Sequence, residues 1–288
     1  MTRRASFGYE RTMPSLSDQG FIDLPPLRLE YRMVGPRPDA APTLVLLHQG
    51  LGSAGLWGDF PERLAAATGL GVFAYSRQGY GHSSPAQLPR ALDFMHREAR
   101  EILPRVLDAI GFRQGVLVGH SDGASIAAIH AGSVQDHRVR GLAMMAPHFI
   151  VEDVTMAAIR SIRQAFDAGA VQFERWHADA AATVHGWSDV WLSNDVRRWD
   201  LTEDLAYIRV PILIIQGEQD SFGTVRQIEI AQEECYCPVE VLMLPDTAHI
   251  PHREAPEATL NAISDFCHRL LRQHKGVGAG GQVADPSS

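Results

Sequence analysis

A serine, an aspartate and a histidine in this chain have the types and local contexts that nucleophilic catalysis requires. Ser121 lies at the centre of the pentapeptide GHSDG, after an apolar run and before an alanine-rich run with helical character. A serine flanked by glycines at a sharp turn from strand to helix is typical of a nucleophile elbow, because glycines leave the strained turn uncrowded. A serine hydroxyl is a weak nucleophile at neutral pH, so it needs a general base that a third group orients.

The expected acid and base each follow an apolar run in the C-terminal part of the chain. One run ends in the turn GEQD, whose last residue is Asp220, and the next ends in PDTAH, whose last residue is His249. Sites in open parallel sheets form at the carboxyl ends of the strands. The sequence therefore predicts that Ser121, Asp220 and His249 meet at one edge of a sheet.

A competing position for the acid follows the apolar run at 139–146, where Glu152 and Asp153 lie. These carboxylates would reach the base from a different strand of the sheet. We favour Asp220 as the acid, because only this residue ends a strand in a Gly-x-x-Asp turn.

Short apolar segments alternate with amphipathic ones along most of the chain. Strands are predicted at 27–34, 43–48, 71–76, 115–119, 139–146, 211–216 and 239–244. Helices are predicted at 60–67, 91–110, 124–131 and 255–272, with Pro104 expected to kink the second of them. Strands of this length and β-branched content, separated by helices, indicate a parallel sheet that is buried on both faces. We therefore expect an α/β fold with a mostly parallel sheet of about eight strands flanked by helices.

The alternation stops at 147–207, where no strand pattern occurs. Helices are predicted in this stretch at 151–168, 171–185 and 190–205. It also holds four of the five tryptophans of the chain, namely Trp176, Trp187, Trp191 and Trp199. The sequence therefore predicts a helical unit at 147–207, inserted into a core that is formed by residues 1–146 and 208–272.

The order of the motifs gives the chain a resemblance to the α/β-hydrolase superfamily over residues 27 to 271. The motifs are LLHQGLGS at 46–53, YSRQGYGHS at 75–83, the GEQD turn and HIPHREAPE at 249–257, in addition to the pentapeptide. The resemblance implies an α/β-hydrolase fold whose helical cap follows strand 6. It also implies a catalytic triad of Ser121, Asp220 and His249.

The resemblance further implies an oxyanion hole formed by the backbone N–H groups of Gly50 and Asp122. Gln49 departs from the family pattern, which usually has glycine there. Its side-chain amide either contacts the substrate or faces solvent and neighbouring backbone. Ser76 replaces a usual aspartate, and because that acid is generally structural, we expect altered local hydrogen bonding rather than lost catalysis.

Substrate contacts are expected from the predicted cap and from the loop that leads into it. The tryptophans either pack the cap onto the core or line the pocket, and we expect Trp187 or Trp191 to line it. His148, at the mouth of the cap, is a further candidate for substrate contact. Three cap arginines either capture a substrate carboxylate or form a solvated helix face: Arg160, Arg163 and Arg175.

Composition limits the classes of partner. The net charge is −8, the sequence pI is about 5.9 and no basic block occurs, which argues against nucleic acid. No apolar run is long enough to span a membrane, and no secretory signal is recognised, so we expect a cytoplasmic protein. Three cysteines form no disulfide framework, and no metal or cofactor is expected. We expect a monomer or homodimer with mobile tails at 1–20 and 273–288.

The resemblance implies a serine hydrolase that cleaves a small ester, lactone or activated C–C bond, similar to carboxylesterases, enol-lactonases and meta-cleavage-product hydrolases. A capped site favours compact substrates, including aromatic or carboxylated ones, over long-chain lipids. Other reactions of the same triad stay open, namely those of a cofactor-free perhydrolase or oxygenase, an acyltransferase or a lyase. A non-catalytic ligand receptor is the remaining alternative, although a pure binder gains nothing from a poised serine and histidine.

Overall fold

The computed structural model describes residues 16–271, and one eight-stranded sheet runs through this part of the chain. The strands are β1 (Gln19–Leu24), β2 (Leu27–Val34), β3 (Thr43–Leu47), β4 (Gly71–Tyr75), β5 (Gly115–His120), β6 (Val139–Met145), β7 (Ile212–Gly217) and β8 (Val239–Leu244). Their spatial order is β1-β2-β4-β3-β5-β6-β7-β8. β2 pairs antiparallel with both β1 and β4, and all other pairs are parallel. The predicted mostly parallel sheet of about eight strands is therefore confirmed.

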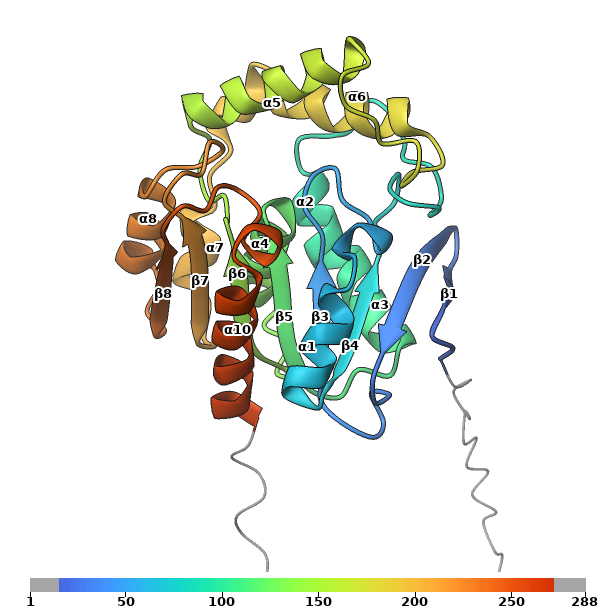
Figure 1. Cartoon of the computed structure of the whole chain (residues 1–288), viewed down its shortest axis with the longest axis vertical. Coiled ribbons are helices and arrows are strands. Elements are labelled where there is room, and N and C mark those ends of the chain that lie inside the picture. Colours follow the sequence, from blue (N-terminus) through green and yellow to red (C-terminus); the bar gives the residue numbers. More distant parts are fainter. Residues whose placement is uncertain (1–15, 272–288) are drawn as a thin grey trace, which may run out of the picture.

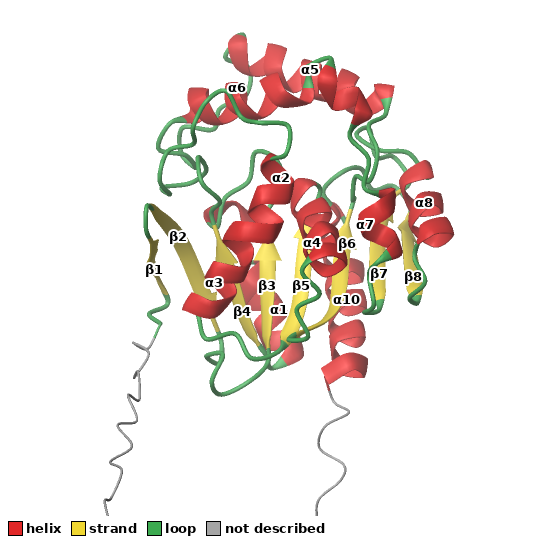
Figure 2. Ribbon diagram, turned by 180° about the vertical axis from the view of Figure 1, so that it is seen from behind, coloured by secondary structure: helices red, strands yellow, loops and turns green. Residues whose placement is uncertain are grey.

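Helices cover both faces of the sheet (Figures 1 and 2). One face is covered by α1 (Phe60–Thr68) and α10 (Pro256–Leu271). The other face is covered by α2 (Phe94–Arg97), α3 (Leu103–Ala109), α4 (Asp122–Ser133), α7 (Thr202–Ala206) and α8 (Arg226–Glu234). Every residue of β3, β4, β5 and β7 is buried, because the central strands of a parallel sheet have apolar layers on both sides. This double cover holds the strand ends rigidly in place.

The predicted strands occur in the structure, and β2 and β8 have the predicted bounds. One prediction was wrong at the N-terminus, where residues 1–20 were expected to be a mobile tail. β1 begins at Gln19 and pairs with β2 across a short turn, from Gln19↔Arg32 to Leu24↔Leu27. The alternating pattern of β1, with Ile22 and Leu24 buried, was the missed signal. Residues 1–15 and 272–288, which hold the rest of the predicted tails, lie outside the described residues.

The long helix predicted at 91–110 is divided in the structure. It begins at Phe94 and passes through a π-helical segment, η2 (Glu98–Ile102), into α3. Pro104 follows this segment directly and lacks the N–H that would continue the helical hydrogen bonds. The change of helix type thus falls just before Pro104, where the kink is expected. The sequence analysis also missed α8, between β7 and β8.

The chain between β6 and β7 forms α5 (Asp153–Asp167), α6 (Ala180–Trp191), a short 3-10 helix η3 (Asp195–Arg198) and then α7. α5 and α6 lie across the carboxyl ends of the strands (Figure 1). The helix predicted at 171–185 was misplaced, because α6 starts only after Asp179, whose side chain accepts a hydrogen bond from Ala182 N (2.8 Å). The helix predicted at 190–205 is broken, since the Asp200 carboxylate accepts from Thr202 N (2.8 Å) and starts α7 separately.

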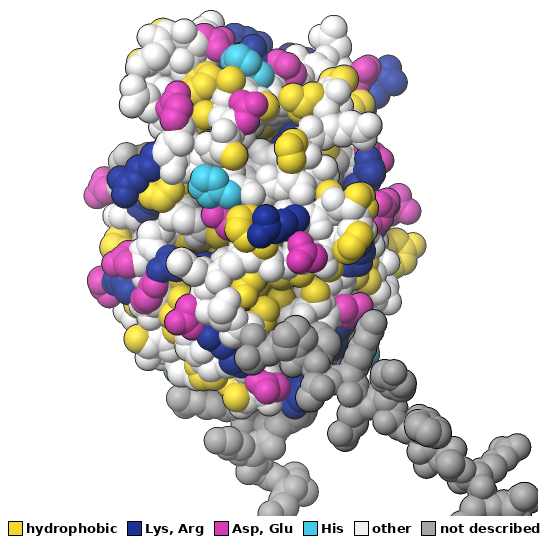
Figure 3. Space-filling view, turned by 90° about the vertical axis from the view of Figure 1, so that its right-hand side faces the viewer, with side chains coloured by type: hydrophobic (Ala, Val, Ile, Leu, Met, Phe, Trp, Pro, Cys, Tyr) yellow, Lys and Arg dark blue, Asp and Glu magenta, His cyan; other side chains and the backbone are white. Residues whose placement is uncertain are grey.

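The described surface carries charges of both signs. Figure 3 shows positive and negative side chains interspersed over the face on the β1 side, without a broad patch of one sign. That face therefore generates no strong field of one sign. Within residues 16–271, no helix has both the length and the apolar character that a membrane crossing requires.

Candidate active site

The turn between β5 and α4 is a strained elbow with Ser121 at its apex. Ser121 has φ 53° and ψ −121°, a backbone conformation that residues other than glycine rarely adopt. A Cβ on Gly119 would lie 2.5 Å from the Cα of Ala124, and one on Gly123 would lie 1.9 Å from the carbonyl oxygen of Leu47. Both glycines are therefore required for the turn to pack against α4 and β3. The structure thus has the strand–turn–helix context that the pentapeptide predicted.

The hydroxyl of Ser121 makes no capping hydrogen bond, although Ser121 lies at the start of a helix. Ser121 occupies the N-cap of α4, but its side chain caps none of the helix N–H groups. Its backbone N–H donates to the carbonyl of Met145 at 2.9 Å, which ties the elbow to β6. With 5% of its surface exposed, Ser121 is almost enclosed. Its oxygen is therefore held at a fixed point and is free for chemistry.

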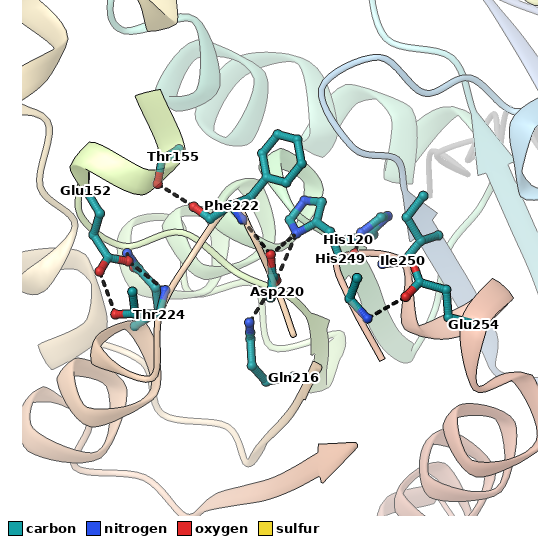
Figure 4. Close-up of polar contacts among 12 residues, drawn as sticks. His120, Glu152, Thr155, Gln216, Asp220, Phe222, Thr224, His249, Ile250 and Glu254 are labelled. Atoms are coloured by element: carbon teal, nitrogen blue, oxygen red, sulfur yellow. Dashed lines mark hydrogen bonds and ion pairs between the residues drawn. The ribbon is translucent and has the colours of Figure 1, made fainter. Parts of the chain in front are cut away.

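The structure brings Asp220 and His249 together. Nδ1 of His249 lies 3.0 Å from Oδ1 and 2.9 Å from Oδ2 of Asp220 (Figure 4). The carboxylate also accepts hydrogen bonds from Phe222 N (2.7 Å) and from Nε2 of Gln216 (2.8 Å). Burial by itself raises the pKa of Asp220, but the hydrogen bond and charge of His249 outweigh it and hold this pKa below its ordinary value. An ionised Asp220 places the proton of His249 on Nδ1, which leaves Nε2 free to accept a proton.

Several contacts fix the position of His249. The ring of Phe222 stacks on the imidazole, with 4.3 Å between the ring centroids. The Glu254 carboxylate accepts from the backbone N–H of Ile250 at 3.0 Å and so closes the turn that follows the histidine (Figure 4). Nε2–H of His120 donates to the backbone carbonyl of His249 at 2.7 Å. Because His120 directly precedes Ser121, this bond holds the turn of His249 beside the elbow.

The two predicted oxyanion donors have free N–H groups. Neither Gly50 N nor Asp122 N donates a hydrogen bond to any residue in the described part of the chain. The loop before Gly50 is held by the buried Arg77, whose guanidinium donates to the carbonyls of His48 and of Gln49, the latter at 3.1 Å. Arg77 N also donates to Nε2 of His48 at 3.1 Å. Arg77 therefore orients this loop.

The two departures from the family pattern have local explanations. The side chain of Gln49 folds over Gly52, where a Cβ would come within 2.7 Å of its Oε1. The hydroxyl of Ser76 accepts from Ala54 N at 2.9 Å and donates to Glu30 Oε2 at 2.7 Å. Ser76 thus links Ala54 to the carboxylate of Glu30 in β2. This is the change in local hydrogen bonding that we expect from the replacement of an aspartate by serine.

The predicted substrate-contact residues lie at or next to the elbow. His148 is buried, and its ring centroid lies 5.7 Å from that of His249 and 5.9 Å from that of Trp191. Burial and the nearby His249 lower the pKa of His148 to about 4, so its imidazole is neutral at physiological pH. Nε1 of Trp187 donates to Oδ2 of Asp122 at 3.0 Å. Both tryptophans of α6 therefore face the candidate site.

The competing acids lie away from His249. Asp153 is exposed at the start of α5 and forms an ion pair with Arg197 at 3.0 Å. Glu152 accepts hydrogen bonds from the backbone and hydroxyl of Thr224 and from Gln227 (Figure 4). Glu152 therefore joins the start of the inserted segment to the loop after β7 and does not orient the base.

The three arginines of the segment 147–207 differ in their contacts. Arg163 pairs with Asp167 (3.0 Å) and Asp189 (2.8 Å), and the guanidinium of Arg175 lies 4.8 Å from the ring centre of Trp176. Arg160 is exposed on α5. Within residues 16–271, no three His, Cys, Asp or Glu side chains are grouped as metal ligands would be.

Sequence reasoning missed three residues that position the site: Arg77, Gln216 and Glu254. Gln216 is a buried amide at the end of an otherwise apolar strand, which was a usable signal because buried polar side chains need partners. Arg77 and Glu254 lie inside the motifs that were recognised. Their partners are backbone groups of distant or adjacent loops, which no residue pattern specifies.

Comparisons with known proteins identify the family of this chain. The model of the alpha/beta hydrolase family matches residues 44–262, and the chain belongs to this family. The protein is thus a hydrolase. It is 25% identical over 249 residues to 3-oxoadipate enol-lactonase 1 of Acinetobacter baylyi, a match that covers 80% of this chain and 90% of the relative.

Solved structures share the fold. A hydrolase from Pseudomonas aeruginosa PA01 superposes with a TM-score of 0.68 at 21% identity, covering 86% of this chain and 98% of that one. The enol-lactonase from Burkholderia xenovorans LB400 superposes with a TM-score of 0.67 at 18% identity, covering 86% and 99%. At these identities the likeness establishes the architecture alone.

Proposed function

We propose that this hydrolase cleaves small carboxylic esters or lactones with Ser121 as nucleophile, His249 as general base and Asp220 as the orienting acid. The observation that carries the proposal is the contact between Asp220 and Nδ1 of His249, on a turn that His120 ties to the elbow. This contact gives His249 the tautomer that a base needs, beside a serine hydroxyl that the fold leaves free.

The mechanism follows from these positions. Ser121 attacks the substrate carbonyl while Nε2 of His249 accepts its proton, and Asp220 stabilises the resulting imidazolium. The free N–H groups of Gly50 and Asp122 receive the developing oxyanion, where one donor is typically worth about 3–4 kcal/mol. His249 then gives the proton to the leaving group, and water attacks the acyl-enzyme with His249 again as base. Apart from the substrate and water, every group that these steps name belongs to this chain.

We propose that the segment 147–207 acts as a cap and selects compact substrates. α5 and α6 lie across the strand ends that carry the candidate triad, and Ser121 is nearly enclosed beneath them. The similarity to a 3-oxoadipate enol-lactonase supports the inclusion of lactones. An activated C–C bond next to a carbonyl is a further substrate for the same steps, because the leaving carbanion would accept the proton of His249.

A fluorophosphonate label tests the nucleophile. Wild-type protein and Ser133→Ala, which changes an exposed serine on the same helix, should be labelled, and Ser121→Ala should not. Hydrolysis of p-nitrophenyl acetate by Ser121→Ala should fall by at least about 1,000-fold, because Ser121 is the nucleophile of the first step of the proposed cycle. The melting temperature should stay within a few degrees of wild type. Activity within tenfold of wild type would remove Ser121 from the mechanism.

A substrate screen then separates the reactions. Short acyl esters, an enol-lactone, a vinylogous 1,5-diketone and emulsified long-chain triglyceride are assayed at equal concentration. We expect turnover of the esters or the lactone and no turnover of the triglyceride. Preferred cleavage of the diketone would move the proposal to C–C hydrolysis, and efficient turnover of the triglyceride would show that the cap does not enclose the site.

A further inference from the structure

Asp122 has a buried carboxylate that the proposed reaction does not use. Its side chain follows the nucleophile directly and is only 1% exposed, and within residues 16–271 its hydrogen-bond partner is Nε1–H of Trp187. Burial raises the pKa of Asp122, although the charge of Arg77 and the indole N–H groups of Trp187 and, at longer range, of Trp191 act in the opposite direction. A buried carboxylate without an ion pair is costly, so its position demands a reason.

Trp187 lies directly over the predicted oxyanion loop. A Cβ on Gly50 would come within 2.2 Å of Nε1 and 2.4 Å of Cε2 of Trp187, so the indole rests on the Cα of that glycine. Its N–H reaches across to Asp122 on the other side of the predicted oxyanion hole. One indole therefore touches both residues whose N–H groups would receive the substrate oxygen.

Trp191 lies one helical turn further along α6 and covers a different side of the site. It faces His148, with 5.9 Å between the ring centroids, and His148 in turn lies 5.7 Å from His249. The two tryptophans share one face of α6, because residues four apart in a helix point the same way. Trp191 thus lies between His148 and Asp122, and of the two tryptophans it is Trp187 that rests on the oxyanion loop.

This arrangement distinguishes the two ends of an ester. The leaving group must lie near His249, because this residue gives it a proton. With the carbonyl oxygen at Gly50 and Asp122, the acyl chain extends away from His249, toward Trp187. The indole of Trp187 therefore stands where an acyl chain would lengthen, and the buried carboxylate of Asp122 holds it there.

We propose that Trp187 limits the length of the acyl group and that the Asp122 side chain is the positioning residue that holds the indole in place. This inference rests on the proposed function and narrows its substrates to esters with a short acyl part, whatever their leaving group. The role is separate from that of the Asp122 backbone N–H, which any residue at this position would supply.

Two substrate series test the proposal. One series lengthens the acyl group, from p-nitrophenyl acetate to butyrate and hexanoate, and the other enlarges the leaving group, from phenyl to naphthyl acetate. Trp187→Ala should raise the hexanoate-to-acetate ratio of kcat/KM by about 10- to 100-fold, with little change in the leaving-group series. Trp187→Phe should shift the same ratio by less, and it keeps most of the packing if the alanine variant folds poorly. Trp191→Phe is the matched comparison: it keeps an aromatic ring against His148 and should shift the acyl ratio less than Trp187→Phe does.

Substitutions at Asp122 test the positioning role. Asp122→Asn keeps an oxygen that accepts from the indole, so its acyl ratio should stay near that of wild type. Asp122→Leu has a similar size but no acceptor, and the unpaired indole N–H should leave its site. Its acyl ratio should therefore move toward that of Trp187→Ala. A merely structural carboxylate would lower the activity or melting temperature of both variants without separating their ratios.

The rate at which methyl and hexyl fluorophosphonates label Ser121 gives the same comparison of size without ester turnover. Failure of the proposed function would appear as labelled protein that hydrolyses no ester, and the labelling ratios would still decide the role of Trp187. An unchanged ratio in Trp187→Ala, a larger change in the leaving-group series, or equal shifts in Asp122→Asn and Asp122→Leu would overturn the proposal.

Discussion

The sheet edge with the elbow and the helical segment above it are held in place by different kinds of contact. At the elbow, backbone packs on backbone, as when Gly123 lies against the carbonyl of Leu47. The segment 147–207 packs apolar side chains on the core, and single side-chain hydrogen bonds add to this packing. Examples are those from Thr183 to the carbonyl of Gly79 (2.8 Å) and from Trp187 to Asp122 (3.0 Å).

We infer from this difference that the sheet edge positions the reacting groups and that the segment above it selects the substrate. Backbone packing leaves a nucleophile no freedom, and a catalytic geometry loses much of its rate when it shifts by about 1 Å. A single side-chain hydrogen bond contributes only about 1 kcal/mol, so one such contact above the sheet can be lost without loss of the fold. We therefore expect substitutions at the sheet edge to destroy activity or folding, and those in the segment to alter selectivity.

The largest expected effect concerns the acid. Asp220→Asn keeps the shape of the side chain but favours the wrong tautomer of His249, so kcat should fall by about 10,000-fold. Asp153→Asn, at the competing position, should stay within about twofold of wild type, because Asp153 contacts Arg197 at the surface. Steady-state kinetics on p-nitrophenyl acetate measure both. If Asp153→Asn lowered kcat in this way instead, the acid would lie in the segment 147–207, and the contrast between that segment and the sheet edge would be wrong.

The next effect concerns the backbone packing of the elbow. Gly123→Ala places a Cβ where the carbonyl oxygen of Leu47 lies, and backbone cannot move aside as a side chain can. It should lower the free energy of unfolding by about 3 kcal/mol or more. Gly55→Ala is the control, since its Cβ would have its nearest contact at 3.5 Å, with Trp176. Urea unfolding of the two variants measures the difference. Equal free energies of unfolding would show that the backbone around the elbow can shift to accept a Cβ.

The smallest effect concerns acid stability at the sheet edge. Burial, followed by the charges of Arg253 and His249, lowers the pKa of His252 to about 3, and His120 also faces its ring. Between pH 6.5 and 3 the unfolded chain binds a proton at this residue that the folded chain does not, so stability falls as the pH falls through this window. His252→Phe, which suits the rings of Trp57 and Phe60, should remove up to about 1.4 kcal/mol per pH unit of that slope.

The measurement for His252→Phe is the melting temperature from pH 7 to pH 4, compared with wild type. The curves should converge or cross on the acid side, because only the wild type has this histidine to protonate on unfolding. Parallel curves would mean that His252 is not kept neutral by the fold.

Much of the sheet could be predicted because its signals are local. A buried parallel strand must be a short apolar run, and this rule located seven of the eight strands. The missed strand, β1, is an edge strand that is buried on one face only, so its pattern was weaker. The segment above the sheet was predicted less well, because α6 begins at a cap formed by Asp179 and α7 follows a turn in which Asp200 accepts from Thr202 N. The period of the hydrophobic residues does not show such local hydrogen bonds.

The residues of the candidate site also differ in how well the sequence predicts them. Its candidate nucleophile, acid and base could be proposed from the sequence because each follows a strand at the same edge of a parallel sheet, and such an edge brings distant residues together. Gln216 and Arg77 were not predicted, since their importance lies in the atoms to which they donate. The amide of Gln216 needs Asp220 beside it, and the guanidinium of Arg77 needs the carbonyls of His48 and Gln49.

The sequence by itself determined the α/β order of elements, the strained serine turn and the turns of Asp220 and His249, because each depends on residues only a few positions apart. Only the tertiary structure decided that Trp187 crosses from Gly50 to Asp122 and that Trp191 faces His148. Those contacts join residues that are far apart in the chain. Their geometry depends on how α6 packs over the sheet, and that packing is the sum of many weak interactions that no single residue encodes.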